Sequence, residues 1–192
     1  MSTVVVIEYV SLDGVVQGPG HAGEDREGGF EHGGWTAPLM HEHSSYLSDQ
    51  FNAAGGFLLG RRTYDIWAGY WPTVTDEHDT IAAALNARPK YVASTTLERP
   101  EWRGTTVIRD VPREIAELRQ LPGGPILVMG SSVLVHTLTT HRLVDQYQLL
   151  VHPVVLGNGK KLFAEHGPRL ALQLLDTTST AGGLVILRFA PE

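Results

Sequence analysis

The stretch FLLGRRTYDIW, residues 57–67, joins an apolar run to a segment with helical character. The apolar run stops at Gly60, and two arginines, Arg61 and Arg62, follow it at once. A short apolar run that ends at a glycine predicts a buried strand, and the aromatic-bearing segment after it predicts a helix. A buried strand that leads directly into a helix is the repeating unit of an α/β protein.

The same unit recurs outward from this stretch in both directions. Strands are expected over residues 3–10, 55–60, 89–95, 105–110, 124–130 and 144–155. Helices are expected over residues 38–53, 61–70, 111–121 and 131–143, and a closing hairpin over residues 169–191. This order predicts an α/β fold with a mostly parallel central sheet and an antiparallel C-terminal strand. We expect a single domain over residues 1–192.

Composition narrows the class of protein. Of the 192 residues, 42% are hydrophobic and 19% are charged, which is typical of a globular protein. The formal net charge of −6, with scattered lysines and arginines, argues against broad nucleic-acid binding. The absence of cysteine removes disulfides and thiolate metal sites and fits a cytoplasmic location. The N-terminus MSTVVVIEYV, interrupted by Glu8, predicts a strand and neither a signal peptide nor a membrane span.

Four loops are the candidate binding elements, because ligands of open parallel sheets bind at the carboxyl ends of the strands. These loops are residues 11–16, 60–64, 93–97 and 129–134. Gly60 lets the backbone approach a phosphate at a helix N-terminus, and the guanidinium of Arg61 or Arg62 can donate two hydrogen bonds to the same phosphate. In the alternative interpretation, Gly60 only makes the turn and both arginines are solvated.

Two of the other loops offer similar groups. Gly130 permits close approach, while Ser131 or Ser132 caps a helix and donates to a phosphate oxygen. Ser94 and Thr95 carry hydroxyls that bind a ribose phosphate or satisfy the turn backbone. Taken together, the loops favour an extended, multiply phosphorylated ligand such as a dinucleotide.

Other motifs are missing from the sequence, and one metal hypothesis stays open. No G-x-G-x-x-G follows a predicted strand, and MGSSV at residues 129–133 is not the G-x-S-x-G of a serine hydrolase. His41 and His43 lie two apart in a predicted helix, so their side chains diverge and do not readily share a metal. We expect no metal, and a metal-dependent hydrolase that adds His32 to one of them is an alternative.

Six motifs in this order resemble the dihydrofolate reductase-like superfamily, and most closely the C-terminal reductase domain of bacterial riboflavin biosynthesis (RibD) and its stand-alone relatives. The motifs are SLDG (11–14), GFEHGGW (29–35), LLGRRTYDIW (58–67), YVAST (91–95), ILVMGSSVLVHTL (126–138) and HPVVLGNGKKLF (152–163). The resemblance implies a three-layer α/β/α fold, NADPH as cofactor, and hydride transfer to a C=N or C=O bond of a small heterocyclic or sugar-like substrate. It also implies a homodimer.

The cofactor contacts that the resemblance implies fall on the four candidate loops. They are a phosphate-binding turn at Gly60, Arg61, Arg62 and Thr63, and a segment near the adenosine 2′-phosphate at Ser94 and Thr95. They also include a turn under the pyrophosphate and nicotinamide at Gly130, Ser131, Ser132 and Val133, and a closing loop at Asp13 and Gly14.

The chain departs from true dihydrofolate reductases in the W-x-x-P-x-acid motif. Trp35 and Pro38 match this motif, but Met40 stands at the acid position, so the carboxylate that recognises a pterin is missing there. We expect Phe30, Trp35 and Trp71 to form an apolar wall for a flat substrate, with Tyr64 as a further substrate contact.

A reductase also needs a proton donor, because hydride transfer leaves negative charge on nitrogen or oxygen. Asp13, Glu31 and His32 are the expected donors, since all three belong to loops near the implied nicotinamide site. The alternative to an enzyme is a module that binds a dinucleotide as a sensor or scaffold without turnover.

Overall fold

A computed structural model of the chain describes residues 1–76 and 78–192. Its strands are β1 (Val4–Ser11), β2 (Gly56–Gly60), β3 (Lys90–Ala93), β4 (Thr105–Ile108), β5 (Ile126–Val128), β6 (Gln146–His152), β7 (Leu172–Ser179) and β8 (Val185–Pro191). Its α-helices are α1 (Ser44–Ala53), α2 (Arg61–Ala68), α3 (Thr80–Ala87), α4 (Val111–Leu118) and α5 (Ser132–Thr140). Short 3-10 helices cover Glu27–Gly29, Ala37–Glu42 and Trp71–Thr73.

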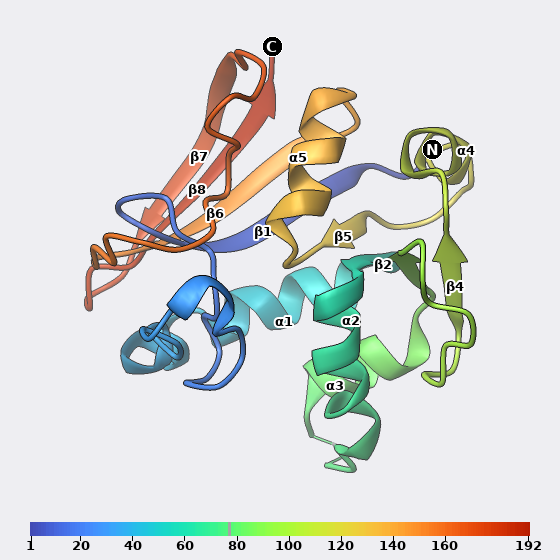
Figure 1. Cartoon of the computed structure of the whole chain (residues 1–192), viewed down its shortest axis with the longest axis horizontal. Coiled ribbons are helices and arrows are strands. Elements are labelled where there is room, and N and C mark those ends of the chain that lie inside the picture. The colour runs from blue at the N-terminus through green and yellow to red at the C-terminus, as the bar shows by residue number, and fades with distance from the viewer. Residues whose placement is uncertain (77) are drawn as a thin grey trace.

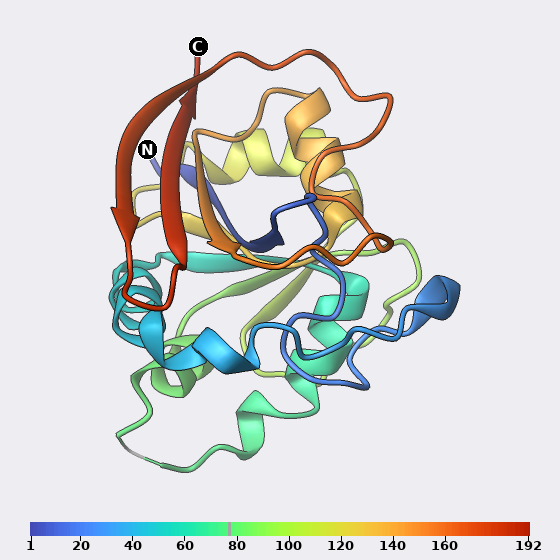
Figure 2. The same ribbon diagram turned by 90° about the vertical axis from the view of Figure 1, so that its left-hand side faces the viewer.

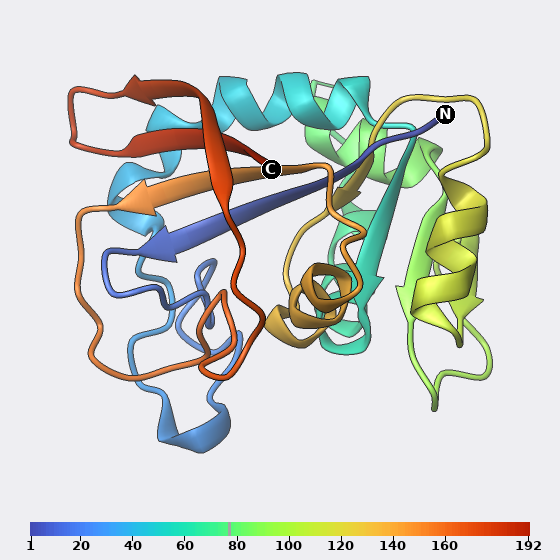
Figure 3. The ribbon, with the colours of Figure 1, turned by 90° about the horizontal axis from the view of Figure 1, so that it is seen from above.

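The strands form one eight-stranded sheet in the order β4-β3-β2-β5-β1-β6-β8-β7. The six strands from β4 to β6 are parallel, and Figure 3 shows β1 and β6 pointing the same way. Strand β8 pairs antiparallel with β6, and β7 pairs antiparallel with β8, so this hairpin forms one edge of the sheet (Figure 2). The predicted mostly parallel sheet with an antiparallel C-terminal strand is confirmed.

Helices cover both faces of the sheet, which gives the predicted three layers. Figure 1 shows α4 and α5 on one side of the sheet and α1, α2 and α3 on the other. Each face has its own apolar cluster, with Phe51 and Leu85 in one and Ile115 and Leu138 in the other. The central strands are therefore mainly apolar, because they are buried on both sides. No helix in the described ranges is long and apolar enough to cross a membrane.

Two helical segments differ from the sequence prediction. The helix expected over residues 38–53 is a 3-10 helix followed by α1, and His43 separates them with non-helical φ and ψ of −119° and 2°. Helix α3 was missing from the prediction, which left residues 71–88 without a helix. Its N-terminus is capped by Asp79, whose carboxylate accepts a hydrogen bond of 2.9 Å from the N–H of Ala82.

Two turns at the carboxyl edge of the sheet touch each other. A Cβ placed on Gly60, at the end of β2, would lie 2.2 Å from both Cβ and Oγ of Ser131, in the turn after β5. Gly130 has a φ of +73°, and a Cβ there would lie 2.6 Å from Oγ1 of Thr63. Only glycine at both positions lets the β2–α2 and β5–α5 turns approach this closely.

Gly60→Ala should therefore destabilise the protein by about 2 kcal/mol, because the new methyl group overlaps a side chain whose Cβ cannot rotate away. Gly69→Ala is the matched control, since a Cβ there would meet carbonyl oxygens at an ordinary 3.6 Å. The control should leave the free energy of unfolding unchanged or raise it by up to about 1 kcal/mol. Urea unfolding of both variants measures the difference, and equal stabilities would contradict the close approach.

Candidate functional site

The candidate site lies where β5 ends between two longer neighbours. Strand β5 pairs with β1 as far as Val6 and Val128, and with β2 as far as Leu58 and Val128. Beyond these pairs, β1 continues to Ser11 and β2 to Gly60, so the sheet opens at its carboxyl edge. Open α/β sheets bind ligands at such an opening.

Two cavities meet at this opening. The outer pocket, of about 420 Å³, lies among residues 60–62, 93–96, 108–109 and 131–137. The inner pocket, of about 660 Å³, extends from residues 129–133 past β1 to α1 and α2. Arg62, Ser131 and Val133 line both pockets, so the two cavities form one groove across the end of β5.

The outer pocket is positively charged. Arg61, Arg62 and Arg109 line it, and no Asp or Glu of the described residues does. The guanidinium of Arg109 donates to the backbone carbonyls of Ser94 and Leu97, so its position is fixed without neutralising its charge. Arg61 also pairs with Asp65 over 2.8 Å, and Arg62 pairs with carboxylates of the glycine-rich loop. Arg109 is therefore the guanidinium of this pocket that has no carboxylate partner among the described residues, and it suits a phosphate dianion.

The turn after β5 presents backbone donors to the groove. Gly130 and Ser131 have φ values of +73° and +70°, and α5 begins at Ser132. A non-glycine residue with positive φ carries strain, and such strain is common at functional sites. Ser131 also caps α5, since its Oγ accepts a hydrogen bond of 3.3 Å from the N–H of Leu134. The free N–H groups of the first helical turn and the helix dipole favour an anion here.

The rim of the inner pocket carries two cations, and both are paired. Arg62 lies 3.0 Å from Asp25 and 2.5 Å from Glu27 of the glycine-rich loop at residues 18–34. The Nζ of Lys160 lies 2.6 Å from each of the same two carboxylates. The hydrogen bonds from Lys160 and then from Arg62 lower the pKa of Glu27. These ion pairs fasten the loop over the pocket.

The far end of the inner pocket is apolar. Its wall comes from α1, α2, the 3-10 helix after α2, and α3. The lining side chains there are Leu47, Phe51, Ile66, Trp67, Trp71 and Ile81.

Glu8 and His43 are two of the buried polar side chains that line the inner pocket. Glu8 of β1 is 4% exposed, and its Oε1 accepts a hydrogen bond of 2.9 Å from the N–H of Gly130. Burial raises the pKa of Glu8 to about 8, so the carboxyl is protonated at neutral pH. His43 is 1% exposed, and neither of its ring nitrogens has a hydrogen-bond partner within the described part of the protein. Burial lowers the pKa of His43 to about 4, so its ring is neutral.

The expected cofactor residues mostly gather along the groove. Only Gly14 lines neither pocket. The outer pocket contains Gly60, Arg61, Arg62, Ser94, Thr95, Ser131 and Val133. The inner pocket adds Thr63, Gly130 and Ser132.

The expected proton donors lie elsewhere. Asp13 accepts hydrogen bonds from Ser11 Oγ and from the N–H groups of Leu156 and Gly157, at 2.7, 3.1 and 2.9 Å. The Ser11 hydrogen bond holds the pKa of Asp13 well below its usual range, so this group ties two loops together as a carboxylate. Glu31 and His32 are exposed, and neither lines a pocket.

Of the expected substrate contacts, Trp71 lines the inner pocket, and the other three side chains do not. Phe30 is a buried residue of the glycine-rich loop, and a Cβ added at Gly18 would lie 3.5 Å from its ring. The indole of Trp35 donates to the carbonyl of Gln17 over 2.9 Å. The hydroxyl of Tyr64 accepts from the N–H of Trp102 over 3.2 Å in the core below α2.

Sequence reasoning missed several residues of the groove, and three of them have a feature in the sequence that points to a functional role. Glu8 interrupts an otherwise apolar strand, and a buried carboxyl is rare without a functional or structural reason. Arg109 directly follows a strand, as Arg61 does. His43 gives a weaker signal, because its burial depends on the break between two helical segments.

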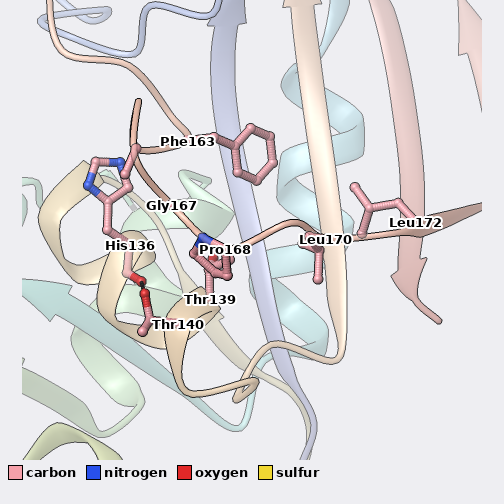
Figure 4. Close-up of a pocket in the computed structure, with 9 residues that line it drawn as sticks. His136, Thr139, Thr140, Phe163, Gly167, Pro168, Leu170 and Leu172 are labelled. Carbon is pink, nitrogen blue, oxygen red and sulfur yellow. Dashed lines mark hydrogen bonds between the residues drawn. The ribbon is translucent and has the colours of Figure 1, made fainter.

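A separate cavity of about 240 Å³ lies on the outer side of α5, between that helix and the segment at residues 163–172 (Figure 4). Thr139, Thr140, Phe163 and Leu170 line it, and no Asp, Glu, Lys or Arg among the described residues does. Across residues 1–76 and 78–192, no three His, Asp or Glu side chains are arranged as metal ligands. The groove across β5 combines charge, a buried acid and volume.

The layers, the sheet order and the groove at the strand ends define a three-layer α/β protein with a candidate binding site at the carboxyl edge of its sheet, and sequence comparison gives the family. Residues 2–186 match the RibD C-terminal domain. The chain belongs to the RibD C-terminal domain family, a family of reductase-like proteins, as the sequence motifs indicated.

Individual relatives agree with this assignment. The uncharacterized Bacillus subtilis (strain 168) protein YyaP is 30% identical over 142 residues, which cover 72% of this chain and 75% of YyaP. YwjB of the same organism is 28% identical over 169 residues, which cover 88% of this chain and 86% of YwjB.

Solved structures share the fold. A Shewanella sp. PV-4 protein named for riboflavin biosynthesis superposes with a TM-score of 0.73 at 17% identity, covering 100% of this chain and 99% of its own. A pyrimidine reductase-like protein from Corynebacterium diphtheriae gives a TM-score of 0.63 at 15% identity, covering 100% and 92%.

Stability should depend on the protonation of Glu8. In the unfolded chain this carboxyl ionises near pH 4.3, and in the folded protein it ionises near pH 8. Between these values the folded state keeps a proton that the unfolded state releases, so the free energy of unfolding falls as pH rises from about 5 to 8. Glu8→Gln removes this dependence. The free energy of unfolding of the variant minus that of wild type should therefore rise by roughly 4 kcal/mol as pH increases from about 5 to 8.

Urea unfolding of wild type and Glu8→Gln at a series of pH values measures this difference. The neutral, buried His43 has the opposite sign, since its lowered pKa makes stability fall as pH drops from about 6.5 to 4. That contribution is common to both proteins and cancels. A stability difference that stays constant from pH 5 to pH 8 would contradict a buried, protonated Glu8.

Proposed function

We propose that this protein is an NADPH-dependent reductase that transfers hydride to a C=N or C=O bond of a small molecule. The observation that carries the proposal is the continuous groove across the end of β5, along which all the expected cofactor residues except Gly14 are collected. Membership of a reductase-like family supports the same reaction class.

The residues of the groove fit the parts of a phosphorylated dinucleotide. Arg61 and Arg109 would hold the 2′-phosphate in the outer pocket, with hydroxyls from Ser94 and Thr95 beside them. The turn at Gly130 and the N-terminus of α5 would receive the pyrophosphate. The inner pocket has the volume for a nicotinamide ring and a substrate together.

When bound, the cofactor supplies the hydride, and the chain supplies orientation and exclusion of water. The loop at residues 18–34 covers the inner pocket through the ion pairs of Arg62 and Lys160 with Asp25 and Glu27. Opening these pairs would admit substrate, and closing them would shield the reacting atoms from solvent.

The alternatives from the sequence have less support. A metal-dependent hydrolase needs converging ligands, which His32, His41 and His43 do not provide among the described residues. A binding module without turnover would have no use for a buried carboxyl and a large apolar pocket next to the cofactor turn. A cytoplasmic location and a homodimer stay predictions, and the half-exposed Leu174 and Leu175 on edge strand β7 support the dimer.

Calorimetric titration with NADPH and with NADH tests the proposal. NADPH should bind more tightly, because the 2′-phosphate gains charge-assisted hydrogen bonds from Arg61 and Arg109. Arg61→Gln and Arg109→Gln should each weaken NADPH binding by about tenfold or more and change NADH binding little. Arg188→Gln is the matched control, since Arg188 pairs with Asp176 on the C-terminal hairpin, far from the groove in the sheet order.

If neither NADPH nor NADH binds at millimolar concentration, the proposed reductase function is refuted. Tight binding that neither arginine substitution weakens would refute the placement of the 2′-phosphate in the outer pocket.

A further inference from the structure

Among the residues that the structure describes, the inner pocket has no unpaired cation for an anionic substrate. Arg62 and Lys160 are its lining cations, and both are paired with Asp25 and Glu27. Glu24 is a third carboxylate on the lining. With Glu8 protonated, the described charged groups of this pocket therefore carry a net negative charge, which disfavours a phosphate or carboxylate on the substrate.

The apolar end of the pocket also disfavours sugars. Its side chains, including Leu47, Phe51, Trp67 and Ile81, offer almost no hydrogen bonds to hydroxyl groups. Burying unpaired hydroxyls costs free energy, whereas aromatic and aliphatic walls stabilise flat apolar rings. A ring compound that reaches between α1, α2 and α3 fits this end of the pocket.

Glu8 and His43 are two of the polar residues that line the same pocket. Glu8 is held in place by the N–H of Gly130, at the turn where the pyrophosphate and nicotinamide are proposed to lie. His43 has two ring nitrogens without partners among the described residues, although the side chain is almost completely buried. A buried polar atom without a partner indicates a ligand or water that completes it.

We propose that the inner pocket binds an uncharged, ring-bearing ketone, aldehyde or imine, whose oxygen or nitrogen accepts a hydrogen bond and then a proton from the carboxyl of Glu8. This inference rests on the proposed reductase function and specifies its substrate class and proton donor. His43 supplies a second, neutral hydrogen bond that orients the compound. Glu8 takes the role that the sequence had assigned to Asp13, Glu31 and His32.

The proposed step is balanced. A reduced nicotinamide bound in the groove would supply the hydride for a new C–H bond at the carbonyl or imine carbon, and the π electrons of the double bond would move to oxygen or nitrogen. The proton of Glu8 would form the O–H or N–H bond there, which would leave an alcohol or amine, the oxidised cofactor and the Glu8 carboxylate. Glu8 then regains a proton from solvent.

The four tryptophans provide a site-specific test that does not depend on turnover. Trp67 and Trp71 line the inner pocket, whereas the indole of Trp102 donates to Asn86 outside it over 2.8 Å. In protein labelled with ¹⁵N-tryptophan, 2-acetylnaphthalene should shift the indole signals of Trp67 and Trp71 and leave that of Trp102 in place. The matched anion 2-naphthoate, and ribose 5-phosphate, should need at least tenfold higher concentrations.

Glu8→Gln tests the hydrogen bond to the ketone. The charge of Glu24 adds to burial in raising the pKa of Glu8, and the charge of Glu8 in turn raises the pKa of Tyr9, while the adjoining turn at residues 129–131 has no titratable side chain. Ketone binding to wild type should weaken about tenfold as pH rises from 7 to 9, because the carboxylate no longer donates. Glu8→Gln, whose amide still donates, should bind with the same affinity at both pH values.

Each outcome decides the inference. It is overturned if 2-acetylnaphthalene shifts neither Trp67 nor Trp71 up to its solubility limit, or if 2-naphthoate or ribose 5-phosphate binds equally well. The role of Glu8 is overturned if wild type and Glu8→Gln share one pH dependence. Calorimetry with NADPH on the same sample separates these failures from failure of the proposed function, since NADPH binding does not require the apolar end of the pocket.

Discussion

Strand β5 stops at Val128 while its neighbours β1 and β2 continue, and the rest of the site depends on this difference in length. A short central strand leaves the sheet open at its carboxyl edge and forces the chain to turn at once into α5. The turn must fit beside the end of β2, which is why Gly60 and Gly130 occupy positions where any Cβ would collide with a neighbour. The backbone donors of α5 are thereby brought to the same edge as the arginines of α2.

The opening also explains the unusual chemistry of the inner pocket. Glu8 lies two residues beyond the last β1–β5 pair, Val6 with Val128, so its carboxyl meets the turn at Gly130 and lines the inner pocket. Burial keeps its carboxyl protonated, and the single hydrogen bond from Gly130 fixes it next to the cofactor turn. On the rim, the ion pairs of Arg62 and Lys160 neutralise the cations and bring the glycine-rich loop over the pocket. The groove therefore changes from positively charged at its outer end to apolar at its inner end.

Local sequence patterns predicted the mostly parallel sheet and many of the residues that line the outer half of the groove, but not Arg109. Apolar runs followed by helical segments predicted the parallel strands, and glycine, hydroxyl and arginine residues at strand ends predicted the loops that meet there. Helix α3 was missed because TIAAALNA is a short, alanine-rich segment with little amphipathic contrast. The inner half of the groove could not be predicted, since Glu8 and His43 acquire their surroundings from strand lengths and helix breaks that act over long sequence separations. Loop residues such as Glu31 and His32 were plausible by sequence position, yet the fold leaves them exposed and outside both pockets.

A crystal structure of the protein grown with saturating NADP⁺ tests the central claim most directly. The claim is that one dinucleotide lies across the end of β5 and joins the two pockets. The account predicts density for the 2′-phosphate beside Arg61 and Arg109, for the pyrophosphate over the turn at Gly130, and for the nicotinamide in the inner pocket near Glu8. A dinucleotide bound outside this groove, for instance in the cavity beside Phe163, would contradict it, as would a groove that stays empty at saturating concentration.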